Sequence, residues 1–178
     1  MLTPSQIATL RAVVLAEPTL DAARQNGDDY AIAAWCNSDA SPAYKVWNTA
    51  TATAIIYDAI SWGNMTPGDA PDATVTYTNR ALAAQAKQIN LQTLLQGRES
   101  ISTGKSSIRT GLQDALTDLP TGPAGALRSG GWSAVKSAIQ RNATNAEKVL
   151  ATGSGTPSSP SDLSFEGKVT PDEASLLR

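Results

Sequence analysis

Signals for the start of a helix recur along this 178-residue sequence and constrain its fold more than any other feature. Thr3-Pro4-Ser5-Gln6 and Thr170-Pro171-Asp172-Glu173 both have the form of a capping box, with threonine as the N-cap and proline at the first helical position. Ser41-Pro42 repeats the combination of a capping residue and a proline. The sequence therefore predicts that helices begin at these three places.

Apolar residues at helical spacing follow these signals through the N-terminal third of the chain. Ile7, Leu10 and Val14 form one stripe that extends until Pro18 interrupts it. Thr19 is the expected cap of a second helix, ending near Gly27. Asp28 or Asp29 is the expected cap of a third, and the apolar positions of this and later helices are Ile32, Trp35, Tyr44, Val46, Trp47, Ile55, Ile56, Ala59 and Ile60. We expect a set of short helices here.

Three longer apolar stripes occupy the second half, after a turn-rich stretch over residues 62–73. They run from about Thr76 to Gln96, from Ile108 to Pro120 and from Trp132 to Leu150. On the first, one face carries Leu82, Ala86, Ile89 and Thr93, and the apolar surface is widened by Leu91, Leu94 and Leu95. These patterns predict an all-α fold over residues 1–151, a bundle of three longer helices with the short N-terminal helices packed around it.

The C-terminal residues change in composition. Residues 152–162 are rich in Ser, Gly and Pro and carry no large apolar side chain, which is typical of a flexible linker. Residues 163–178 then contain the chain's only Phe and the second capping box. We expect an extended docking segment that binds a partner through Phe165, Val169, Leu176 and Leu177. The alternative is a frayed terminus.

The absence of histidine and the single cysteine, Cys36, exclude many kinds of active site. Ser-His-Asp triads, Cys-His dyads, HExxH zinc sites, CxxC redox pairs and an intramolecular disulfide all require residues that are missing. No apolar run approaches the roughly 18 residues of a membrane-spanning helix. The N-terminus lacks the pattern of a secretory signal, so we expect synthesis in a cytoplasm and no membrane association.

Few of the remaining motifs could carry chemistry. Asp114 and Asp118 are spaced to share one helix face, where they could act as a carboxylate pair, but lysine or arginine partners or simple solvation explain them as well. Gly104-Lys105-Ser106 lacks the earlier glycine of a phosphate-binding loop. We therefore expect no catalytic, cofactor-binding or metal-binding residues, and a protein that is not an enzyme.

The charge is uneven along the sequence. Residues 1–79 carry three cations and eight anions, and residues 80–148 carry nine cations and four anions, so their net charges are −5 and +5. One interpretation is an acidic-to-basic contact within or between chains, which would involve Arg98 and Arg109 if it lies between subunits; the other is unevenly charged, solvated helix faces.

The sequence is similar to the small, mostly helical head-to-tail connector proteins of tailed bacteriophages, which form a ring between the portal and the tail. The similarity covers most of the chain and is carried by the segments LTPSQIATLRA, SPAYKVW, DAISWGNMTP, NLQTLLQGRESISTGKSSIRTGLQDALTDLPTGPAG, GWSAVKSAIQRNATNAEKVLATGSGT and SFEGKVT. None of these is a defined chemical motif.

The resemblance implies a structural protein of the virion neck, assembled in the host cytoplasm. It implies an adaptor ring of 12 subunits that contacts the portal protein, a downstream stopper or tail protein and, without sequence specificity, the DNA in its channel. It also implies docking of the C-terminal segment on the portal. A stopper or tail-completion protein of the same neck remains an alternative, as does a muramidase-like enzyme that uses Asp114 and Asp118.

Overall fold

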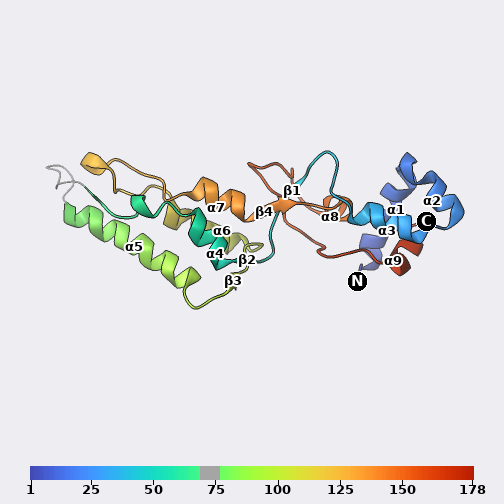
Figure 1. Cartoon of the computed structure of the whole chain (residues 1–178), viewed down its shortest axis with the longest axis horizontal. Helices are drawn as coiled ribbons and strands as arrows, with labels where there is room; N and C mark the ends of the chain where they lie inside the picture. Colours follow the sequence, from blue (N-terminus) through green and yellow to red (C-terminus); the bar gives the residue numbers. More distant parts are fainter. Residues whose placement is uncertain (69–76) are drawn as a thin grey trace. The chain divides into compact units, whose positions relative to one another are not determined.

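The computed structural model describes residues 1–68 and 77–178, and these residues form two compact units. Unit 1 comprises Met1–Trp47 together with Gln140–Arg178, and unit 2 comprises Asn48–Ile139. Figure 1 shows that blue and red segments, from opposite ends of the sequence, lie side by side in unit 1. The expected division into a domain of residues 1–151, a linker and a tail is therefore corrected, because unit 1 is discontinuous in sequence.

The helices α1, α3 and α9 of unit 1 begin where their capping residues predict. Its helices are α1 (Pro4–Ala16), the 3₁₀ turn η1 (Pro18–Leu20), α2 (Asp21–Asn26), α3 (Asp29–Asn37), α8 (Asn145–Leu150) and α9 (Pro171–Ser175). Both expected capping boxes form, with the Thr3 and Thr170 side chains accepting from the backbone three residues later. Asp28 caps α3, and Gly27 ends α2 with a φ of 68°. The expected short helices are present, but Thr19 as the cap of the second is wrong: Thr19 lies inside η1, which Glu17 caps, and α2 follows without a capping side chain.

Two small antiparallel sheets show that the prediction of an all-α fold is wrong. In unit 1, β1 (Lys45–Trp47) pairs with β4 (Gln140–Asn142), and in unit 2, β2 (Thr51–Ala52) pairs with β3 (Ser100–Ile101). Ser41-Pro42 thus precedes a strand, in which Val46 is completely buried and its two neighbours are half-buried. Strands of two or three residues are too short to display alternation, and their partners are distant in sequence.

The expected long helix from Trp132 to Leu150 is also wrong. The chain forms α7 (Trp132–Ala138), then β4, then α8. Thr144 starts α8 through a capping box with Glu147, which restarts the helix after the strand. The apolar spacing of one helix extends across the strand because the residues on both sides of it are buried. They are buried in different cores, however: Val135 in unit 2 and Ala146 in unit 1.

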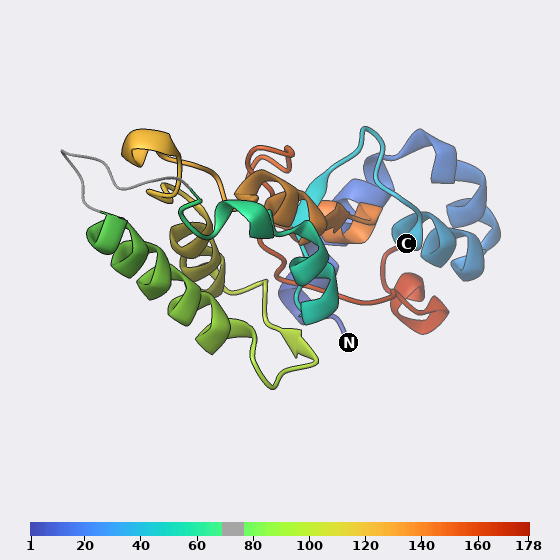
Figure 2. The same ribbon diagram turned by 60° about the vertical axis from the view of Figure 1, so that its left-hand side comes forward.

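Unit 2 is built from helices that follow one another along residues 48–139. They are α4 (Thr53–Ala59), the 3₁₀ turn η2 (Trp62–Asn64), α5 (Tyr77–Leu95), α6 (Ser106–Leu116), the 3₁₀ turn η3 (Pro123–Gly125) and α7. α5 packs along α6, as Figure 2 shows. The core includes Ile56, Met65, Leu91, Leu95, Leu112, Leu116, Leu119, Val135 and Ile139. Of the turn-rich stretch 62–73 and the helix start at Thr76, residues 69–76 lie outside the described residues.

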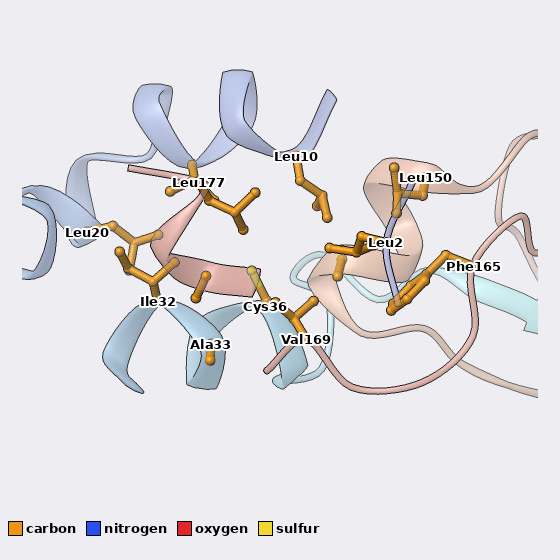
Figure 3. Close-up of a cluster of buried hydrophobic side chains, with 13 residues drawn as sticks. Leu2, Leu10, Leu20, Ile32, Ala33, Cys36, Leu150, Phe165, Val169 and Leu177 are labelled. Carbon is orange, nitrogen blue, oxygen red and sulfur yellow. The ribbon is translucent and has the colours of Figure 1, made fainter. Parts of the chain in front are cut away.

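The C-terminal segment belongs to the core of unit 1 and is not held free for a partner. Figure 3 shows Phe165, Val169 and Leu177 among side chains from α1, α3 and α8. Val169 is 2% exposed and Leu177 is fully buried, while Leu176 is 53% exposed. The Asn37 side chain fixes Val169 by donating to its carbonyl at 2.9 Å and accepting from its N–H at 2.8 Å. The expectation of a docking segment is corrected, because these apolar groups complete the protein's own core.

The expected linker, residues 152–162, is tied to β1 by its backbone. Ser161 donates to the carbonyl of Lys45 at 2.9 Å and accepts from the N–H of Trp47 at 3.1 Å, and Gly155 accepts from the N–H of Lys45 at 2.7 Å. The small polar side chains of this segment do not make it a flexible linker, because its backbone groups form hydrogen bonds with β1. Within the described part of the chain, no helix combines the length and apolar character needed to cross a membrane.

Candidate interaction surface

The two carboxylates considered as a catalytic pair do not share a helix face. Asp114 lies on α6, but that helix ends at Leu116. Asp118 lies beyond the end, with a φ of 51° in the left-handed region. Both residues are exposed. The spacing argument therefore fails, because helical periodicity stops before the second carboxylate is reached. Among the described residues, no group of three or more Asp, Glu, Cys or His could hold a metal ion.

Arg98 and Arg109, expected at a subunit contact, differ in their surroundings. Arg98 is exposed in the turn that follows α5. Arg109 is half-buried, and its guanidinium donates to the carbonyls of Thr103 and Gly104 at 3.1 and 2.6 Å. Arg109 thus stabilises the turn before α6 within its own chain, which leaves Arg98 as the better candidate for an outside contact.

The charge asymmetry of the sequence does not map onto the folded units. Unit 1 contains seven Lys or Arg and ten Asp or Glu, a net charge of −3, and unit 2 contains seven and six, a net charge of +1. The basic stretch of residues 80–148 is split between the units, because Arg141 and Lys148 belong to unit 1. The chain is therefore acidic in its first half and basic in its second only along the sequence, and neither folded unit carries that contrast.

The most distinctive surface of unit 2 is the outward face of α5, which we call the α5 outer face: Leu82, Ala86, Ile89 and Thr93. Leu82 is 58% exposed and Ile89 is 53% exposed. The opposite face of the helix is in the core, where it contributes Ala84, Leu91 and Leu95. By spacing alone, both sets are expected to form one broad apolar surface. The structure separates them, since α5 carries two apolar stripes and only one is buried.

The α5 outer face is also free of charge. The two charged residues of α5 are Arg80 and Lys87, and neither is exposed. Arg80 is buried and donates to the carbonyl of Gly122 at 3.0 Å. The Lys87 ammonium donates to the carbonyls of Asp114 and Thr117 at 2.6 and 2.7 Å, at the C-terminal end of α6, where a cation is favoured. Both cations donate to backbone carbonyls of neighbouring segments of unit 2, so the outer face is uncharged.

A shallow cavity of about 290 Å³ lies beside this face, between α5 and α6. It is lined by Asn90, Thr93, Leu94, Gly111 and Asp114. A Cβ at position 111 would approach the Leu94 side chain to 3.1 Å, so glycine permits the close packing of the two helices here. The cavity therefore extends the α5 outer face with a polar margin.

A second exposed apolar surface of unit 2 contains an aromatic pair, Tyr57 and Trp62. Their rings stack with centroids 5.6 Å apart and planes inclined by 18°. The Trp62 indole N–H donates to the carbonyl of Tyr57 at 3.0 Å, which fixes the pair. Trp62 is 49% exposed, and so is Ile55, which lies on α4. The sequence predicts Ile55 on an apolar helix face, but the exposure and stacking of Tyr57 and Trp62 have no local signal, because isolated aromatic positions do not reveal which side chains stay outside the core.

In unit 1, Arg141 and Glu147 form an ion pair whose carboxylate is buried. Glu147 is 2% exposed, and the Arg141 guanidinium donates to both of its carboxylate oxygens at 2.7 Å. Burial alone would raise the pKa of Glu147. The hydrogen bonds from Arg141 and from the N–H of Thr144 outweigh that effect and hold the pKa below its ordinary value. Burial also raises the pKa of the Cys36 thiol to about 11.

Comparison of the chain with known protein families, with curated proteins and with solved structures gave no match in any of the three.

Proposed function

We propose that this protein is a structural component of the neck of a tailed bacteriophage, an adaptor that joins the portal to the tail. The observation that carries the proposal is the pair of exposed apolar surfaces on unit 2, the α5 outer face and the aromatic pair. Depletion of charge together with exposed apolar and aromatic side chains is typical of surfaces that other protein chains cover. The resemblance of the sequence to head-to-tail connectors supports the phage neck as the assembly in which these surfaces are covered.

In the proposed assembly, copies of the chain form a ring of about 12 subunits around the DNA channel. A closed ring requires two different surfaces on each subunit, because every subunit contacts one neighbour on either side. Unit 2 offers two such surfaces on different elements. Contacts with the portal protein above, with a stopper or tail protein below and with DNA in the channel complete the proposed set of partners.

An enzymatic function has less support. The muramidase-like alternative depended on Asp114 and Asp118 lying on one helix face, and α6 ends before the second residue. We therefore propose a protein without catalytic turnover. A stopper or tail-completion protein of the same neck would use similar surfaces, and the position of the added density on the portal distinguishes it from the adaptor.

The test is to mix the purified full chain with the portal protein of the same phage and to image the mixture by electron microscopy. We expect a ring of extra density bound directly to the portal, with the symmetry of the portal. Mass photometry of the same sample would give the number of copies. A chain that ignores the portal but clears cell-wall substrate would contradict the proposal.

A further inference from the structure

We propose that the α5 outer face is a contact between two copies of this chain, in which the two α5 helices lie antiparallel about a two-fold axis. This contact does not rest on the proposed function. A two-fold contact closes at two copies and occupies the same α5 outer face that the proposed ring would use, so the dimer and the ring are alternative assemblies of the chain.

The spacing of the outer-face residues is that of a helix–helix seam. Leu82, Ala86, Ile89 and Thr93 follow one another at intervals of four, three and four residues. This is the spacing of the a and d positions of a coiled coil, which keeps a narrow stripe directed at a second helix. The buried stripe on the other side fixes α5 to unit 2 and leaves this seam without a partner in the described part of the chain.

The sizes of the side chains favour an antiparallel pair. With the two-fold axis between residues 86 and 89, Leu82 faces Thr93 of the second copy and Ile89 faces Ala86. Each large side chain then meets a small one, which allows close and even packing of the two helices. In a parallel pair with the same register, Leu82 would face Leu82 and Ala86 would face Ala86, which leaves a gap at the alanine layer.

The charges also favour a second copy as the occupant. A face that pairs with itself brings identical charges together, and the exposed residues of α5 that the structure describes carry none. Nucleic acid is a poor occupant, because its recognition depends on cations and this face presents none. A contact of about three helical turns is at the small end of specific interfaces, below about 1,200 Å², so we expect a weak dimer whose population rises with concentration.

Sedimentation velocity of the full chain, from about 1 µM to about 1 mM, tests the dimer. Ile89→Lys places a cation in the seam and should weaken the dimer by about tenfold or more. Leu15→Lys is the matched control, since Leu15 is 50% exposed on α1 of unit 1, outside both apolar surfaces of unit 2, and should leave the dimer unchanged. Circular dichroism would verify that both variants are folded. A chain that is monomeric throughout, or one whose self-association is unchanged by Ile89→Lys or weakened equally by Leu15→Lys, would overturn the proposal.

Cysteine cross-linking tests whether the two α5 helices are antiparallel. It remains informative even if the Ile89→Lys variant does not fold. The native Cys36 is fully buried and gives no background. In the antiparallel pair, a mixture of Leu82→Cys and Thr93→Cys chains should form mixed disulfide dimers on mild oxidation. Leu82→Cys alone should not, because the two copies of residue 82 are about 16 Å apart along the axis and a disulfide requires Cα atoms within about 7 Å. Cross-linking of Leu82→Cys alone, or none in the mixture, would contradict the antiparallel contact.

Discussion

At the scale of single residues, the ion pair between Glu147 and Arg141 makes unit 1 sensitive to acid. The pKa of Glu147 in the folded chain lies below its ordinary value of 4.5, so its stabilising contribution is complete above about pH 4.5 and is lost as the pH falls through the folded pKa. Glu147→Gln should lower the free energy of unfolding by about 2 to 3 kcal/mol at pH 7 and flatten its acid dependence, as measured by urea titration at several pH values. Glu166→Gln, at the exposed end of the same network, should cost less than about 1 kcal/mol.

Cys36 should report the unfolding of unit 1. The side chain is fully buried on α3, and burial raises the pKa of the thiol to about 11, so the reactive thiolate is scarce and inaccessible in the folded state. We expect the rate of labelling by a thiol reagent to be negligible in buffer and to rise with urea in parallel with the loss of helical signal. Ala34→Cys, exposed on the same helix, should react at once. Rapid labelling of wild-type Cys36 in buffer would mean that α3 separates from the core without global unfolding.

At the scale of elements, two adjacent leucines near the C-terminus test whether α9 belongs to the core. Leu177 is fully buried and Leu176 is 53% exposed. Leu177→Ala should destabilise unit 1 by about 2 to 5 kcal/mol through lost burial and a cavity, whereas Leu176→Ala should change the stability by no more than about 0.5 kcal/mol. Thermal denaturation followed by circular dichroism would measure both. If both substitutions change the stability by equally small amounts, residues 163–178 do not belong to the core of unit 1.

The elements that could be predicted from the sequence are those with local causes. The caps at Thr3, Asp28 and Thr170 were predictable because the side chain of each accepts a hydrogen bond from the backbone N–H only three residues later. β1 was not, since its partner β4 lies far along the chain and three residues carry no readable period. The outer face of α5 was missed for a different reason: helical spacing reveals that a stripe is apolar but does not reveal whether another element covers it.

At the scale of the whole molecule, the two-unit organisation is a consequence of pairing between distant segments. Trp47 is the register partner of Gln140 in the β1–β4 ladder, which brings the two parts of unit 1 together. Asn48 donates its backbone N–H to the carbonyl of Ile139 at 2.9 Å, so the first and last residues of unit 2 are also adjacent. No composition change marks either boundary in the sequence. A candidate interface on α5 could therefore be located only after the structure had separated the two cores.

The same adjacency predicts that unit 1 folds without unit 2. Because Trp47 and Gln140 are antiparallel partners, an Asn-Gly turn can replace residues 48–139 and convert β1 and β4 into a hairpin. The shortened chain retains the thirteen buried side chains that form the core of unit 1, including both ends of the sequence. We expect a cooperative urea transition and a Cys36 thiol that is protected from labelling, as in the full chain. A control carrying the same turn and Leu177→Ala should unfold at lower urea. If the shortened chain labels at once and shows no transition, unit 1 depends on unit 2 for its stability, and the two compact units are not independent in folding.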